Sequence, residues 1–425
     1  MNYVKGKLIE AEERAEALVA LPAYIANTLA GKPLTGSEVI SACDQLSKTL
    51  GEAHISLLEA TAVPPHKAEE YVLEAKTQLS ADYLNHKLEI ELGGTYGRQR
   101  VVQAEAQPIT TVVEEVAPLG VLFHIVAGNV SALPAFSVVE GLLVGNINLM
   151  KLPSNDNDLS LFIINELVSI EPRLADYIYV FDYSSQDIEE LRLLANLADA
   201  IVVWGGDEAV SAARSMAPPN TRVIEWGHKI SFAYGVPGPE LDNALDALAA
   251  SMLENNQLFC SSCQGLYVDT DDIEVVHEYA QRMLDALEAC VSRDSQDIGL
   301  SAQLGLKLHS QLLESIYQSQ TVYRGEKSSV IASEDKRLET SLQFGNCWVK
   351  PLPRQGIIPV IRPHKNHLQT CALICPDSDY ELLKQLLQRA GIVRVCGADA
   401  MEKTYLGMPH DGEYALRRYT RVVSG

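Results

Sequence analysis

Short apolar segments alternate with segments of helical periodicity along most of the chain after Pro118. The pattern predicts strands over residues 121–126, 148–152, 177–181 and 200–204, and helices over residues 132–144, 159–170 and 188–195. Strands covered on both faces are apolar throughout, and parallel strands need a crossover connection, which the helices provide. The alternation therefore predicts an α/β fold built on a parallel sheet with helices on both faces.

A Gly- and Pro-rich segment and a second alternating region predict how the chain divides into domains. Residues 235–239, Gly-Val-Pro-Gly-Pro, mark the predicted boundary, and the second region runs from Gly265 to about Val395. Residues 1–90 have a mostly helical pattern, and the tail after His410 predicts a turn, a short helix and a final strand. We therefore predict two domains and a C-terminal segment, with bounds at residues 1–235, 236–403 and 404–425.

Composition excludes several classes of protein. The chain has 425 residues, of which 47% are apolar and 21% charged, as in a soluble globular protein. No apolar run approaches the ~20 residues that span a bilayer, and the N-terminus lacks a signal core, so we expect a cytoplasmic protein. The net charge of −22 excludes nucleic acid as a partner, and eight cysteines are too dilute for a disulfide scaffold.

Cys260 stands between a predicted helix, residues 241–255, and the apolar segment that begins at Leu266. A thiol at such a junction is exposed to substrate and surrounded by backbone N–H donors, which suits a nucleophile. Taken alone, Cys260 also fits a buried apolar cysteine. Cys263 completes a Cys-x-x-Cys pair, but no second pair or histidine cluster accompanies it, so we predict no metal site.

Polar residues and glycines follow the predicted strands of the first region. Asn129 follows the first strand and Lys151 ends the second, and Gly205 with Gly206 follows the fourth. In an open parallel sheet the carboxyl ends of the strands form the ligand crevice, so these residues are expected to face it. Glu225 precedes Cys260 by 35 residues.

These segments, in this order, resemble the aldehyde dehydrogenase superfamily, most closely its bacterial acyl-CoA reductase (LuxC-type fatty-acid reductase) branch. The resemblance covers residues 111–263 and returns at residues 391–397 and 410–416. It implies an aldehyde dehydrogenase-like fold, with two parallel-sheet α/β domains and a helical N-terminal segment. It also implies that the C-terminal strand is used in oligomerisation, and hence a homo-oligomer.

The resemblance implies roles for three catalytic residues. Cys260 corresponds to the nucleophile, and Asn129 to the asparagine whose side-chain amide forms an oxyanion hole with the Cys260 backbone N–H. Glu225 corresponds to the base that activates water in aldehyde-oxidising members, a step that thioester reduction does not need. Taken alone, Asn129 also fits a loop-capping residue, and Glu225 a carboxylate paired with Lys229 or Arg222.

A nicotinamide cofactor is also implied. Lys151 corresponds to the lysine that binds the adenosine ribose, and Ser154 replaces a glutamate common in NAD-preferring relatives. A serine beside a lysine can donate to a 2′-phosphate, which favours NADPH, while nearby Asp156 leaves NADH open. The other implied cofactor contacts are Ile125, Val126, Ala127, Gly205 and Gly206. Taken alone, Lys151 fits a solvated strand end, and the two glycines fit a simple loop turn.

The implied activity is NADPH-dependent reduction of a fatty acyl thioester to the aldehyde through an acyl-cysteine. The donor is acyl-CoA or an acyl-protein, and an acyl-activating or acyltransferase protein is a further implied partner. One alternative is an aldehyde dehydrogenase that forms the acid, although residues 343–346, Gln-Phe-Gly-Asn, lack the glutamate of that class's Glu-x-Phe-Gly-Pro stretch. The other is a non-catalytic scaffold for an acyl-transfer complex, against which stand the intact Asn129, Glu225 and Cys260.

Overall fold

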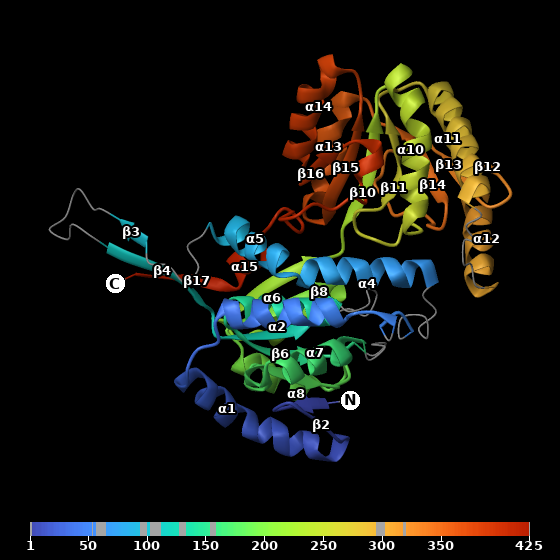
Figure 1. The fold of residues 1–425 in the computed structure, drawn as a ribbon. Coiled ribbons are helices and arrows are strands. Elements are labelled where there is room, and N and C mark those ends of the chain that lie inside the picture. Colours follow the sequence, from blue (N-terminus) through green and yellow to red (C-terminus); the bar gives the residue numbers. More distant parts are fainter. Residues whose placement is uncertain are drawn as a thin grey trace. The chain divides into compact units, whose positions relative to one another are not determined.

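The computed structural model describes residues 2–52, 54–56, 65–93, 100–102, 112–126, 133–153, 159–294, 302–317 and 320–424 (Figure 1). The chain divides into two compact units. The first unit comprises Met1–Gly227 together with Leu406–Gly425, and the second comprises His228–Tyr405. Each unit has its own seven-stranded sheet and its own buried clusters.

The sheet of the first unit is parallel except at one edge. Its described strands follow the order β2 (Lys7–Ile9), β1 (Asn2–Val4), β7 (Ile178–Phe181), β6 (Ile147–Lys151), β5 (Val121–Ile125), β8 (Ala200–Gly205), β9 (Arg222–Gly227). The strands from β7 to β9 pair in parallel, which confirms the four predicted strands of this region. The β1–β2 hairpin is antiparallel, with Lys5 and Gly6 in its left-handed turn, so the mostly helical N-terminal region begins with two short strands.

Helices cover this sheet and account for most of the first 90 residues, as predicted. They are α1 (Arg14–Ala30), α2 (Gly36–Thr49), α4 (Pro65–Leu79), α5 (Ala81–Leu92), α6 (Leu133–Leu143), α7 (Leu159–Ile170), α8 (Ile188–Leu197), α9 (Asp207–Met216) and α15 (Ala415–Arg418). α2 begins where Thr35 and Glu38 form a reciprocal capping box. Within the described ranges, none of the helices combines the length and apolar character needed to cross a bilayer.

The tail follows the predicted order of turn, short helix and strand. After α15, β17 (Thr420–Ser424) pairs antiparallel with β4 (Val112–Pro118). β4 also pairs with β3 (Arg100–Val102), which gives a small three-stranded sheet in the described residues. Val422 and Val423 of β17 are exposed.

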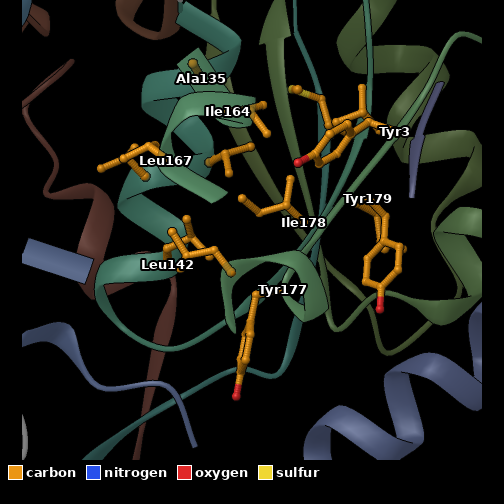
Figure 2. Packing of buried hydrophobic residues seen from close by; sticks show 14 of the residues in the cluster. Tyr3, Ala135, Leu142, Ile164, Leu167, Tyr177, Ile178 and Tyr179 are labelled. Atoms are coloured by element: carbon orange, nitrogen blue, oxygen red, sulfur yellow. The ribbon is translucent and has the colours of Figure 1, made fainter. Parts of the chain in front are cut away.

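The core of the first unit packs α6 and α7 against the sheet. Figure 2 shows Leu142 of α6 and Ile164 and Leu167 of α7 beside Ile178 of β7, and all four are fully buried. Each aliphatic side chain of this size contributes about 1.5–3 kcal/mol when it leaves water. Tyr179 points to the opposite face of β7, where its ring stacks on Tyr24 of α1 with centroids 6.4 Å apart.

The second unit repeats the layered arrangement. Its described strands follow the order β12 (Thr321–Arg324), β13 (Ser329–Ala332), β14 (Asn346–Pro351), β11 (Cys263–Val268), β10 (Ile230–Gly235), β15 (Leu368–Ile374), β16 (Arg394–Cys396). All neighbours pair in parallel except β12 and β13. One face packs on α10 (Pro239–Glu254) and α11 (Ile273–Asp294), and the other packs on α13 (Ile357–Ile361) and α14 (Asp377–Ala390). α12 (Ala302–Tyr317) completes the helices that Figure 1 labels in this unit.

The sequence predicted that the first domain ends at residue 235. The structure divides the units earlier in the chain. β10 pairs with β11 and β15, so residues 230–235 belong to the second sheet, and the units separate between Gly227 and His228. The Gly- and Pro-rich segment is instead the turn between β10 and α10, in which Gly238 has a φ of 144°. A turn inside a βα unit uses the same residues as a linker, and only strand pairing separates the two cases.

His124 of β5 is a fully buried ionisable side chain in the first unit. Its Nε2 donates to Asn148 Oδ1 (3.0 Å), because Asn148 Nδ2 is already donating to the Asn146 carbonyl. Nδ1 is left to accept from Ser137 Oγ (2.8 Å). Burial disfavours the imidazolium and lowers the pKa of His124 to about 4.

We expect this histidine to make the protein less stable in acid. Its pKa in the unfolded chain is about 6.5, so the unfolded state binds the proton first. The free energy of unfolding should fall as the pH drops from about 6.5 to about 4, by roughly 3 kcal/mol in all. His124→Gln should remove this part of the pH dependence in urea unfolding, whereas His86→Gln, at an exposed histidine, should keep it. Equal pH dependence in the two variants would contradict the assignment.

Candidate active site

Cys260 lies on a tight turn between α10 and β11. After α10 ends, Asn256 and Gln257 adopt left-handed backbone conformations, with φ of 52° and 61°. The turn is closed by the Ser262 N–H, which donates to the Phe259 carbonyl (3.1 Å), and by the Phe259 N–H, which donates to Ser262 Oγ (3.2 Å). The predicted helix–strand junction is confirmed, and the Cys260 side chain is half-buried.

Side chains from β10, which pairs with β11, and from β15, on the far side of β10, hold Cys260. Gln369 of β15 donates from Nε2 to Cys260 Sγ (3.1 Å). Ser231 Oγ of β10 donates to the Cys260 carbonyl (2.7 Å) and accepts from the Thr370 N–H (3.0 Å). These contacts gather at the amino ends of β10, β11 and β15, opposite to the carboxyl ends at which ligands usually bind in an open sheet.

Gln257 ties the turn to the rest of the second unit. Its side chain is buried, with Nε2 donating to the Cys263 carbonyl (3.0 Å) and to Ser341 Oγ (3.2 Å). Its Oε1 accepts from the Gly345 N–H (3.0 Å). Residues 343–346, which correspond to the Glu-x-Phe-Gly-Pro stretch considered for the aldehyde dehydrogenase alternative, thus support the turn in this unit.

The carboxylate of Glu402 lies beside the same turn. Its Oε2 accepts from Ser261 Oγ (2.9 Å) and from Asn255 Nδ2 (3.3 Å). Burial raises the pKa of Glu402, although these donors act in the opposite direction.

The sequence prediction had not singled out four of the residues that hold this turn: Ser231, Gln257, Gln369 and Glu402. A signal existed for Gln369, a glutamine near the start of the mostly apolar strand β15. Ser231 has a similar position near the start of β10, whereas Gln257 and Glu402 carry no signal of their own, because glutamine and glutamate are ordinary in loops.

Cys263 is a core residue. Its side chain is fully buried, its Sγ lies 3.4 Å from the Gly265 carbonyl, and burial raises the pKa of its thiol well above the usual value. All eight cysteines are free, so Cys260 and Cys263 are not joined. The residues that the structure describes contain no cluster of histidine, cysteine and acidic side chains that could hold a metal ion.

Glu225 belongs to the first unit and Cys260 to the second. Glu225, on β9, forms a two-pronged ion pair with Arg214 of α9, in which Arg214 Nη2 donates to Oε2 (2.9 Å) and Nε donates to Oε1. The sequence named Lys229 and Arg222 as possible partners. Arg222 was wrong, because the carboxylate pairs with Arg214, and Lys229 belongs to the second unit. Lys229 donates to the Asn366 carbonyl, and Arg222 donates to the Thr420 carbonyl.

An aromatic cluster surrounds this part of β8 and β9. The rings of Trp204 and Trp226 stack with centroids 5.4 Å apart, and His410 lies about equally close to both, at 5.0 and 5.1 Å. Arg418 covers Trp226 and donates to the Glu225 carbonyl (3.3 Å). The tail segment therefore packs on the end of the first unit's sheet that carries Glu225.

The predicted cofactor residues that the structure describes lie at or just after the carboxyl ends of strands in the first sheet. Ile125 and Lys151 are register partners at the carboxyl ends of β5 and β6, and Val126 follows β5. Gly205 ends β8 and Gly206 begins α9 as its N-cap. Asn129, Ala127 and Ser154 lie outside the described residues.

One local feature of this end of the sheet leaves room for a ligand. A Cβ built on Gly206 would meet no heavy atom within 4 Å, so the space beside the first turn of α9 is open, whereas at Gly205 it would meet Ala209 Cβ at 3.0 Å. Lys151 is half-buried, and burial lowers the pKa of its ammonium despite the nearby Asp182.

Replacing Gln257 should destabilise the second unit. Gln257→Ala leaves the Cys263 carbonyl and the Gly345 N–H without their partner, which costs about 2–4 kcal/mol of unfolding free energy in all. Urea unfolding of the full chain checks this, with Gln385→Ala on the exposed side of α14 as the matched control. If the two variants unfold at the same urea concentration, Gln257 does not hold the turn.

Solved structures of known dehydrogenases share this fold. Methylmalonate-semialdehyde dehydrogenase from Oceanimonas doudoroffii matches with a TM-score of 0.77 and 13% identity, covering 100% of this chain and 97% of that one. NADP-dependent glyceraldehyde-3-phosphate dehydrogenase from Bacillus halodurans matches with a TM-score of 0.76 and 14% identity, covering 100% and 98%. At these identities the likeness establishes the aldehyde dehydrogenase-like fold that the sequence predicted.

Two relatives are similar in sequence. The long-chain acyl-protein thioester reductase 2 of Photobacterium leiognathi is 23% identical over 320 residues, which are 72% of this chain and 64% of the relative. The long-chain acyl-protein thioester reductase of Aliivibrio fischeri gives the same identity and coverage. The chain thus spans less than two thirds of the length of these relatives.

The family itself is identified by a match over nearly the whole chain. Residues 33–422 match the family described as acyl-CoA reductase (LuxC), a span that includes the whole second unit, most of the first and every predicted site residue. The chain belongs to the acyl-CoA reductase (LuxC) family.

Proposed function

We propose that this protein reduces an acyl thioester to the aldehyde through an acyl-enzyme on Cys260. The observation that carries the proposal is the setting of Cys260: a half-buried thiol on a turn, with a side-chain amide donor on its sulfur. Cys263 and Cys371 differ in burial, since both are fully buried. The family match and the names of the two relatives support the same reaction.

The proposed reaction has two stages on Cys260. The thiolate forms a bond from Sγ to the acyl carbon, and the bond from that carbon to the donor sulfur breaks, so the donor leaves as a thiol after taking up a proton. NADPH, when bound, supplies the hydride that reduces the acyl carbon. The bond to Sγ then breaks, its electron pair returns to sulfur, and the aldehyde is released with Cys260 as a thiolate again.

Two further residues have roles in the proposal. The side-chain amide of Asn129 and the backbone N–H of Cys260 stabilise the oxyanion, a kind of contact whose loss costs about 10²–10³ in turnover. Glu225 exchanges protons with substrate, product or thiol and does not activate water. The ion pair with Arg214 supports this limit, because both carboxylate oxygens of Glu225 already accept hydrogen bonds from the guanidinium.

The residues at the carboxyl edge of the first sheet fit a nicotinamide dinucleotide. Lys151 would bind the adenosine ribose and its 2′-phosphate, and the open space at Gly206 lets a ligand approach the first turn of α9. The remaining contacts in the proposal are Ile125, Val126, Ala127, Ser154 and Gly205. We propose NADPH rather than NADH, because the Lys151 ammonium group can donate a charge-assisted hydrogen bond to the 2′-phosphate.

The donor and the assembly are also part of the proposal. The relatives' name, acyl-protein thioester reductase, supports an acyl-protein donor delivered by an acyl-activating or acyltransferase partner, with acyl-CoA as the free equivalent. We propose a cytoplasmic homo-oligomer that uses β17. The exposed Val422 and Val423 on that strand support this use, since apolar side chains on a strand favour association.

Cys260→Ala should abolish reduction. Without the sulfur no acyl-enzyme forms, so NADPH-dependent aldehyde formation from long-chain acyl-CoA should fall about a thousandfold or more. Radiolabelled acyl-CoA should also fail to label the protein. Cys290→Ala, at another half-buried cysteine, is the matched control and should stay active. Aldehyde formation that survives in Cys260→Ala would exclude the scheme.

The competing oxidation is tested in the reverse direction. The enzyme is incubated with a long-chain aldehyde and NADP⁺, with and without coenzyme A. The proposal expects acyl-CoA as product and dependence on the thiol, whereas free acid as sole product would favour an aldehyde dehydrogenase with Glu225 as hydrolytic base. No turnover in either direction, with Cys260 labelled no faster than the other cysteines, would favour a scaffold.

Lys151→Met should weaken the use of NADPH more than that of NADH. The lost charge-assisted bond is worth about 1.5–3 kcal/mol, so kcat/KM for NADPH should fall about 10- to 100-fold. Steady-state rates with both cofactors measure this, with Lys384→Met on α14 as the control. An equal loss for NADH and NADPH would show that Lys151 does not select the phosphate.

A further inference from the structure

We propose that Gln369 is a further catalytic residue, whose side-chain amide donates to the Cys260 thiolate when it attacks and again when it leaves. This role rests on the proposed function, in which Cys260 is both nucleophile and leaving group. The contact is direct, with Gln369 Nε2 3.1 Å from Cys260 Sγ. It lies entirely within the second unit, on residues that the structure describes.

The backbone of β15 is irregular where Gln369 stands. Between Ile230 and Phe232 of β10, the partner residues on β15 run from Leu368 to Cys371, so β15 holds one extra residue. That extra residue lies at positions 369–370. Such a bulge turns a side chain away from its regular direction on the sheet, and bulges are frequent beside active sites. The irregularity therefore gives the glutamine a direction that a regular strand would not.

A second bulge lies on the other side of β10, directly after the turn that carries Cys260. From Ser231 to Ala233 of β10, the partners on β11 run from Cys263 to Leu266, so β11 also holds one extra residue. Ser231 stands between the two bulges and bonds to both sides, accepting from Thr370 and donating to the Cys260 carbonyl. The positions of sulfur and amide are thus set by the same small group of hydrogen bonds.

The orientation of the Gln369 amide follows from its neighbour. Thr370 Oγ1 lies 3.4 Å from Gln369 Oε1 and donates to it, which identifies the other amide atom, facing the sulfur, as the donor Nε2. Gln369 is only 8% exposed, so water competes little for this donor. A neutral amide adds no charge to the site, in contrast to the histidine that activates many cysteine nucleophiles.

An N–H donor is worth more to a thiolate than to a thioester sulfur, because the bond is charge-assisted only with the thiolate. Gln369 therefore raises the fraction of Cys260 that is ionised before attack. It also stabilises the sulfur that leaves when the thiohemiacetal collapses to aldehyde, since a lower thiol pKa makes a better leaving group.

Other ionisable groups near the turn have assigned partners. Glu402 accepts from Ser261, and Cys263 and Cys371 are buried thiols. His367 Nδ1 lies 3.3 Å from the His228 carbonyl, and Lys229 donates to the Asn366 carbonyl. Of these, Glu402 is the charge whose removal could imitate an effect on the thiol, so it is included in the test.

The test is the pH dependence of Cys260 alkylation by iodoacetamide in the full chain without cofactor, read by mass spectrometry against Cys260→Ala as background. Gln369→Met keeps the length of the side chain and removes the donor. The midpoint of the pH profile should rise by about one unit, so that alkylation at pH 7 slows about tenfold. Gln369→Glu should raise the midpoint further, and Gln388→Met on exposed α14 should leave it unchanged. Glu402→Gln should not raise it.

The outcomes separate the two proposals. An unchanged midpoint in folded Gln369→Met and Gln369→Glu overturns the role of Gln369, whether or not the wild type reduces acyl-CoA. A raised midpoint, with a parallel fall in kcat for acyl-CoA reduction, supports it. A raised midpoint in a wild-type background that forms no aldehyde overturns the proposed function and leaves the Gln369–thiolate contact standing. If Gln369→Met does not fold, Gln369→Glu and Gln369→Asn supply the same comparison.

Discussion

The turn that carries Cys260 depends on the satisfaction of buried hydrogen bonds at the amino edge of the second sheet. The two bulges that flank β10 interrupt regular ladder pairing, and each leaves backbone groups that need other partners. Ser231, Gln257 and Gln264 supply them, with Gln264 Nε2 donating to the Gln257 carbonyl (3.1 Å). Without these side chains, the turn would bury unpaired donors and acceptors at a cost of about 1–3 kcal/mol each.

The two units use opposite ends of their strands. In the first unit the proposed cofactor residues lie at the carboxyl ends of β5, β6 and β8, where a parallel sheet opens between its helices. In the second unit Cys260 lies at the amino ends of β10, β11 and β15. The general rule for open sheets therefore locates Lys151 and the glycines but not the proposed nucleophile, which depends on a helix-to-strand connection instead.

Close packing also constrains the start of β11, at Gly265. A Cβ on Gly265 of β11 would come within 2.2 Å of the Trp348 ring of β14, so no other residue fits there. Trp348 in turn packs on Tyr267, with ring centroids 4.7 Å apart. The start of β11, which follows the Cys260 turn directly, is thus fixed on one side by hydrogen bonds and on the other by aromatic packing.

The sequence by itself determined the layered α/β architecture, the helix–strand junction at Cys260 and the position of Lys151 at a strand end, because each depends on local periodicity. Tertiary structure alone decided which sheet β10 joins and which cation pairs with Glu225, since both depend on neighbours that are distant in sequence. Gln369 is the clearest example: 109 residues separate it from Cys260, and a one-residue bulge turns its amide toward the sulfur. Local pattern specifies the elements, but strand register and bulges specify which side chains meet, and register is a property of the assembled sheet.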